Sequence, residues 1–83
     1  LTLREQGDWY ARIAVAAATS GDKIEAMRIW RVAANASPAR PVHLAELARS
    51  GLKEKLAAFY RELGRKLPGS EAPAKALKML EQE

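Results

Sequence analysis

The chain has 83 residues, of which 48% are hydrophobic and 29% are charged, with a formal net charge of +4 at pH 7. This length allows one domain with a modest core, and the composition is that of a globular protein rather than a disordered one. The absence of cysteine excludes disulfides and thiolate chemistry. No apolar run has the length of a membrane span or of a signal core, so the localisation stays unknown. Because the chain begins at Leu1 without Met, we expect a fragment of a longer chain.

The first predicted helix runs from Asp8 to about Ser20. Gly7 is expected to end any upstream helix, Asp8 is a typical N-cap residue, and apolar residues follow at helical spacing. Residues 1–7 are therefore expected to form an N-terminal extension. Gly21 then makes the turn, because glycine readily adopts the left-handed backbone conformation that ends helices.

The second predicted helix begins after Asp22, which is its expected N-cap, and ends near Ala36. One side of this helix is apolar and includes Trp30, while charged residues occupy the other side. Pro38 and Pro41 end the helix, because proline lacks an amide hydrogen and disfavours helical backbone in the residue before it.

Three further segments complete the predicted helices. The third helix is expected over residues 41–49 and is closed by Gly51, and the fourth is expected over residues 52–66. The last is expected to begin at its N-cap Ser70 and to end near Gln82. The fourth has the clearest amphipathic pattern of the chain. Its apolar side consists of Leu52, Leu56, Phe59, Tyr60, Leu63 and Leu67. No strand pattern competes, so the sequence predicts an all-α fold.

One spacing occurs twice in the chain. At a period of 30 residues, Ala26, Trp30 and Pro38 recur as Leu56, Tyr60 and Pro68, and each set follows a glycine, Gly21 or Gly51. A period of this size is typical of stacked helical hairpins.

The repeated pattern resembles the tetratricopeptide repeat family, whose unit is a hairpin of about 34 residues with the consensus W-x2-L-G-x2-Y…A-x3-F…P. The first-helix signature falls on Tyr10, Ile13, Ala14 and Ala17 in residues 8–38, and on Arg40, His43, Leu44 and Leu47 in residues 39–68. The second unit is about four residues shorter than the family unit. The resemblance implies a right-handed superhelix of about five stacked antiparallel helices, closed by a capping helix over residues 70–83.

The same resemblance implies a non-catalytic protein–protein interaction module, a scaffold or adaptor that binds a peptide or helix in a groove of small residues. The positions expected to face this groove are Ala11, Val15, Ala18, Thr19, Ala45 and Arg49. The alternative that these alanines only pack between helices stays open. No predicted element packs against Trp9 and Tyr10. Two alternatives therefore stay open, self-association through this end of the molecule and packing of Leu1 and Leu3 over these two side chains.

A helix-turn-helix-like nucleic-acid-binding domain is the alternative function. The positive net charge and the turn glycine Gly51 between two short helices fit such a motif. Glu46 and Leu47 do not fit, because the motif usually has an apolar residue followed by a small one there. Glu54 and Glu62 lie on the second helix of this motif, which is the predicted helix over residues 52–66, and they would repel phosphates. The sequence therefore favours a protein partner over nucleic acid.

The sequence shows no catalytic or metal-binding constellation. The single histidine, His43, is expected to face solvent, and no carboxylate pair accompanies a candidate nucleophile. The glycines are scattered as helix stops rather than gathered in a phosphate-binding loop. We therefore predict no enzymatic activity, no cofactor, no metal and no insertion into a membrane.

Overall fold

The structure is a computed structural model that describes residues 1–83, and it contains helices and no strand. In chain order the elements are α1 (Leu3–Thr19), α2 (Lys23–Ala36), α3 (Pro41–Leu47), the kinked connection η1 (Ala48–Leu52), α4 (Lys53–Lys66) and α5 (Ala72–Glu81). This confirms the predicted all-α class.

The start of α1 differs from the prediction, because the helix begins at Leu3 rather than after Asp8. Thr2 is the N-cap, and its hydroxyl accepts a hydrogen bond from the backbone N–H of Glu5 at 3.1 Å. The Glu5 carboxylate in turn accepts one from the backbone N–H of Thr2 at 3.0 Å. This reciprocal pair is a capping box, and it outweighs the N-cap preference of Asp8, which lies within the helix.

Gly7 was expected to end any helix before Asp8, but it lies inside α1 and is buried. A Cβ atom added at Gly7 would lie only 2.0 Å from the Oγ of Ser37, the residue that caps the end of α2. The missing side chain therefore lets the first part of α1 approach the end of α2 closely.

The other helix ends lie near their predicted positions. Gly21 and Gly51 have positive φ values of 91° and 87°, as the turn after α1 and the kink within η1 require. Asp22 caps α2 through a hydrogen bond from the backbone N–H of Glu25 at 3.1 Å. At α5 the N-cap is Glu71 rather than the predicted Ser70.

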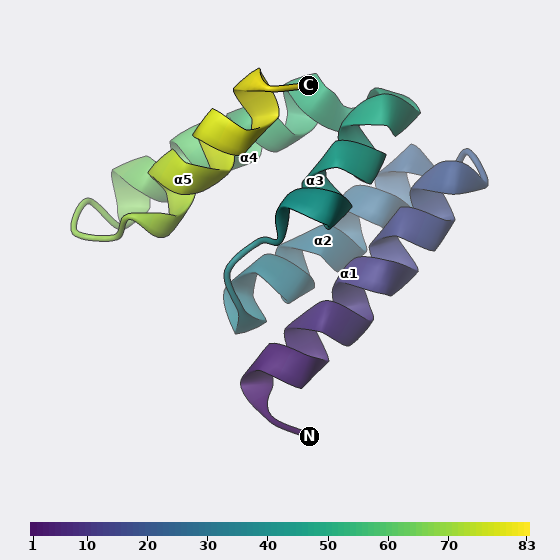
Figure 1. Cartoon of the computed structure of the whole chain (residues 1–83), viewed down its shortest axis with the longest axis horizontal. Helices are drawn as coiled ribbons and strands as arrows, with labels where there is room; N and C mark the ends of the chain where they lie inside the picture. Colours follow the sequence, from purple (N-terminus) through teal and green to yellow (C-terminus); the bar gives the residue numbers. More distant parts are fainter.

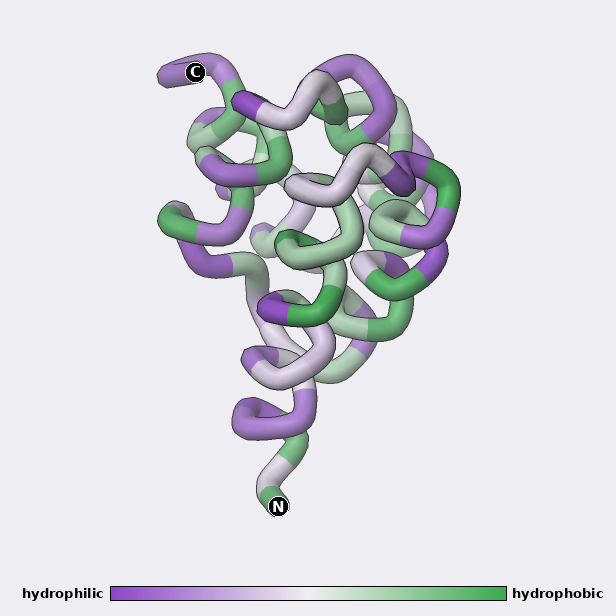
Figure 2. The backbone as a smooth tube through the Cα atoms, turned by 90° about the vertical axis from the view of Figure 1, so that its right-hand side faces the viewer, coloured by the Kyte–Doolittle hydropathy of each residue, from purple (hydrophilic) through white to green (hydrophobic).

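The helices are arranged in two layers (Figure 1). The helices α1, α3 and α5 lie next to one another and run in the same direction, and α2 and α4 lie behind them and run in the opposite direction. The first turns of α1 extend beyond the rest of the molecule (Figure 2). Hydrophilic and hydrophobic residues alternate along each helix in that view, as expected when one side of each helix is buried.

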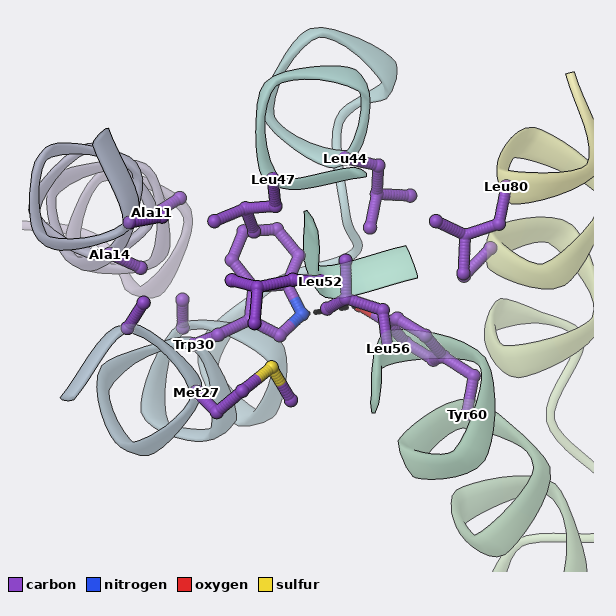
Figure 3. Packing of buried hydrophobic residues seen from close by; sticks show 14 residues of the cluster. Ala11, Ala14, Met27, Trp30, Leu44, Leu47, Leu52, Leu56, Tyr60 and Leu80 are labelled. Atoms are coloured by element: carbon purple, nitrogen blue, oxygen red, sulfur yellow. Dashed lines mark hydrogen bonds between the residues drawn. The ribbon is translucent and has the colours of Figure 1, made fainter. Parts of the chain in front are cut away.

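The hydrophobic core lies between the two layers. Its largest fully buried side chains are Trp30, Leu44, Leu47, Leu52, Leu56 and Pro73. In Figure 3 the Trp30 ring lies in the middle of the labelled cluster with its nitrogen directed toward Tyr60, and the Trp30 Nε1–H donates a hydrogen bond of 3.1 Å to the Tyr60 hydroxyl. The core therefore contains a polar contact that ties α2 to α4.

The helices α2 and α4 match each other residue by residue. Each has 14 residues, and Lys23 and Lys53 are their first residues. The matched pairs at the period of 30 residues are Gly21 with Gly51, Ala26 with Leu56, Trp30 with Tyr60, and Pro38 with Pro68. Both glycines have positive φ, the next two pairs are buried, and both prolines are exposed. The helices α1 and α3 differ more, because α1 has 17 residues and α3 has 7.

Candidate functional site

A groove of about 1010 Å³ lies between the first half of α1 and the segment that joins α2 to α3. We call it the N-terminal groove. Its apolar lining includes Leu1, Leu3, Trp9, Trp30, Ala33 and Pro38. The capping box shapes this groove, because it extends α1 back to Leu3 and so supplies one wall.

Large apolar side chains are exposed on the α1 wall of the N-terminal groove. Trp9 is 60% exposed and Leu3 is 67% exposed, and Leu1 is more exposed still. Tyr10 beside them is also exposed. Leu1 and Leu3 therefore leave Trp9 and Tyr10 open to solvent, which agrees with the uncovered end expected from the sequence.

A cluster of charges forms the polar part of the groove and links α1 to the segment before α3. The Asp8 carboxylate accepts a hydrogen bond from Arg40 Nη1 at 3.0 Å and pairs with Arg12 Nη2 at 2.8 Å. The hydrogen bond from Arg40 is the main reason why the pKa of Asp8 lies below its ordinary value, and Arg12 and His43 add to the effect.

His43 was expected to face solvent, and this prediction is wrong. Its side chain is only 12% exposed, and its Nε2 lies 3.8 Å from the Asp8 carboxylate. The reason is that α3 packs against α1, which turns His43 into the N-terminal groove. Burial lowers the pKa of His43 below its ordinary value of 6.5, although the charge of Asp8 acts in the opposite direction.

The six residues expected to bind a partner do not form one open surface. They are Ala11 and Ala18, which are buried in the core, Val15 and Ala45, which are half-buried, and Thr19 and Arg49, which are exposed. Only Ala11 lines the N-terminal groove. The tight packing of α1 on α2 explains the burial, because alanine lets two helix backbones approach closely.

The polar members of that set already have partners within the chain. Thr19 donates its hydroxyl hydrogen to the backbone carbonyl of Val15 at 2.9 Å. The Arg49 guanidinium lies 3.3 Å from the Glu46 carboxylate and 4.0 Å from that of Glu83. A carboxylate of a ligand would therefore compete with these acids for Arg49.

A second groove, of about 580 Å³, lies between α2 and α4, and we call it the α2–α4 groove. Its apolar residues are Ile24, Met27, Ala58, Phe59 and Leu63, and its charged residues are Lys23, Arg31, Lys55, Glu62 and Lys66. Phe59 and Leu63 belong to the predicted apolar side of the fourth helix, whereas no role is predicted for Met27. The basic residues on both helices are the feature of the sequence that could have indicated this groove.

The segment α3–η1–α4 corresponds to the alternative helix-turn-helix. Gly51 makes the turn, but Leu56 and Tyr60 of α4 are buried and α5 packs against α4. On the outside of α4, Glu62 pairs with Arg65.

None of the helices is both long and apolar enough to cross a membrane. No group of three or more His, Asp or Glu side chains is arranged to hold a metal ion. Comparison with protein-family models, curated proteins and solved structures finds no match to this chain.

Proposed function

We propose that this chain is a non-catalytic protein-interaction domain that binds a peptide or helix of a partner protein in the N-terminal groove. The observation that carries the proposal is the exposed apolar wall of α1, where Trp9 is 60% exposed and Leu3 is 67% exposed. Tryptophan is enriched among the residues that contribute most to protein interfaces, since it buries a large apolar area at a low cost in conformational entropy.

The groove also has the composition of an interface. Apolar side chains form its wall, and the Asp8, Arg12 and Arg40 charges stand together on its polar side. Protein interfaces commonly combine an apolar centre with a polar rim. A volume of about 1010 Å³ is enough for several side chains of a peptide.

The tetratricopeptide-like architecture is part of the same proposal. The equal lengths of α2 and α4 and the matching environments of residues 30 positions apart support two related hairpins followed by a capping helix. Arrays of such hairpins commonly present grooves to peptides. The proposed binding surface differs from the groove expected for such an array, because Ala11 and Ala18, which were expected to face that groove, are buried.

Affinity capture from host lysate with the whole chain tests the proposal, with nuclease treatment in a parallel sample. The expected result is a discrete protein that persists after nuclease, is lost with Trp9→Glu and is retained with Val32→Glu. Val32 is a suitable control, because it is also exposed and apolar but lies outside both grooves.

Two other outcomes would overturn this assignment. Loss of the captured protein with Arg49→Glu but not with Trp9→Glu would move the site to the surface of α1 and α3 predicted from the sequence. If every captured protein is lost on nuclease treatment, the result would favour the helix-turn-helix alternative. Arg49 and Trp9 are both well exposed, so neither substitution is expected to unfold the chain.

A further inference from the structure

The α2–α4 groove has an apolar strip along its length. Phe59 and Leu63 of α4 are half-buried, Met27 of α2 is buried, and Ile24 is 84% exposed at one end. An exposed isoleucine alone is ordinary, but here it continues a strip that reaches the core. From Lys55 to Lys66 the α4 wall spans about three helical turns, or ~16 Å.

None of the four cations around this strip lies within ion-pair distance of a carboxylate, although Lys66 attracts the Glu62 carboxylate at longer range. The side chains of Lys23, Arg31, Lys55 and Lys66 all line the groove. None of them forms an ion pair, and the same is true of Arg4, Lys53, Arg61 and Lys78 outside this groove. The other basic residues, Arg12, Arg28, Arg40, Arg49, Arg65 and Lys75, each pair with a carboxylate of the chain. The one acid in the lining, Glu62, pairs with Arg65 outside it. The groove therefore carries an excess of positive charge that the protein does not neutralise itself.

We propose that the α2–α4 groove binds an acidic amphipathic helix of a partner protein. The apolar side of such a helix would cover Ile24, Phe59 and Leu63, and its carboxylates would reach the lysines on both rims. Helices that dock in grooves use apolar residues at spacings of three and four, which suits a wall of about three turns. A nucleic acid fits less well, because the floor of the groove is apolar. This surface is separate from the N-terminal groove, so the inference goes beyond the proposed function.

The probe for a direct test is a fluorescent synthetic helix of about 15 residues with Leu on one side and Glu on the other. Binding to the whole chain is measured by fluorescence anisotropy. The double variant Lys55→Gln/Lys66→Gln is expected to bind this helix about three- to tenfold more weakly. The matched control Lys53→Gln/Lys78→Gln removes the same charge from exposed, unpaired lysines outside the groove, and a change of less than about twofold is expected.

Methionine methyl signals give a second readout. The chain has two methionines, of which Met27 lines the groove and Met79 belongs to α5. On addition of the acidic helix to the methyl-labelled chain, the NMR signal of Met27 is expected to shift while that of Met79 stays in place. Replacing Leu by Ala in the probe is expected to abolish both the binding and the shift.

Three results would overturn the proposal. Equal weakening by the two lysine pairs would mean attraction to the whole basic chain rather than to the groove. Unchanged binding of the alanine probe would exclude a role for the apolar strip. A single-stranded oligothymidylate that binds more tightly than the helix and shifts Met27 would assign the groove to nucleic acid. Trp9→Glu is expected to leave the affinity for the probe within about twofold, so failure here and failure of the proposed function are distinguishable.

Discussion

Trp30 and Tyr60 are joined by a buried hydrogen bond of 3.1 Å from the indole N–H to the phenol oxygen. They occupy the same position in α2 and α4, 30 residues apart, so the two matched helices are tied together at matching residues. The contact also satisfies the polar atoms of two large aromatic side chains in an otherwise apolar core. Burial raises the pKa of Tyr60 to about 12, so the phenol stays protonated at neutral pH.

The first prediction follows from this contact. Tyr60→Phe removes the hydroxyl and leaves the Trp30 N–H buried without an acceptor, which is expected to lower the free energy of unfolding by about 1–3 kcal/mol. Urea unfolding followed by tryptophan fluorescence measures the change. The control is Tyr10→Phe, which alters an exposed phenol and is expected to change stability by less than ~0.5 kcal/mol.

Trp30→Ala tests the same region by removing side-chain volume from the core rather than a hydrogen-bond acceptor. Loss of a fully buried indole is expected to cost about 3–5 kcal/mol, which is enough to unfold a domain of this size. Circular dichroism at 25 °C would then show the loss of helix. A variant that melts like the parent chain would contradict the central place of Trp30 in the core.

The second prediction concerns Gly7. Alanine is the better helix former, by about 1 kcal/mol, but a Cβ at this position would lie 2.0 Å from Ser37 Oγ and 2.8 Å from Ser37 Cβ. Gly7→Ala is therefore expected to lower the melting temperature. Gly64→Ala is the matched control, because its Cβ would meet Pro73 at an ordinary 3.7 Å, and it is expected to stabilise the chain by about 0.5–1 kcal/mol.

The clash at Gly7 can also be relieved from the other side. Ser37→Gly removes both of the closest atoms, so the double variant Gly7→Ala/Ser37→Gly is expected to recover part of the stability that Gly7→Ala loses. If the double variant instead loses as much stability as the two single variants together, α1 and the end of α2 do not meet at these residues.

The third prediction concerns the first turn of α1. Thr2→Ala removes the acceptor of the capping box and is expected to fray residues 3–6, seen as a loss of helical Cα chemical shifts. The cost to the whole fold is expected to be about 1 kcal/mol or less, because Leu3 is exposed and contributes little to the core. Thr2→Ser keeps the hydroxyl and should preserve the helix, and equal fraying in both variants would exclude the capping box as the cause.

Much of the fold could be predicted from the sequence, because local signals agreed with the packing. The glycines at 21 and 51, the N-cap Asp22, the first helical residue Pro41 and the apolar stripe of α4 all identify helices whose ends the structure places nearby. The start of α1 was missed for a local reason. Two N-cap signals compete there, namely Asp8 after Gly7 and the Thr2–Glu5 pair. The predicted start at Asp8 is wrong, because the Thr2–Glu5 pair forms the capping box.

The candidate sites could be predicted less well, because they depend on contacts between segments distant in sequence. Nothing near His43 in the sequence indicates that Asp8, 35 positions before it, will be its neighbour. Ala11 and Ala18 were assigned to an open groove by resemblance, whereas the close approach of α1 and α2 buries them. Likewise the unpaired state of Lys55 and Lys66 appears only when the positions of all carboxylates are known.

The last prediction concerns pH, and it depends on the single histidine of the chain. Burial lowers the pKa of His43 in the folded state below 6.5, so just below pH 6.5 the unfolded chain binds more protons than the folded one. The free energy of unfolding is therefore expected to fall as the pH is lowered from 7.5 through 6.5 to the pKa of folded His43, and to level off below it. The lowered pKa values of Asp8, Glu25 and Glu62 act in a lower window, since their contribution is lost as the pH falls below about 5.

Urea unfolding at pH 7.5 and at pH 5.0 measures the effect of His43, and an NMR titration of its ring protons gives the pKa directly. His43→Gln is the control, because it removes the only side chain with an ordinary pKa in this range, so its stability is expected to change much less between the two pH values. A parent chain that becomes more stable at pH 5.0 would mean that attraction to Asp8 at 3.8 Å outweighs the burial of the ring. In that case protonation of His43 would strengthen the link between α1 and α3 instead of weakening it.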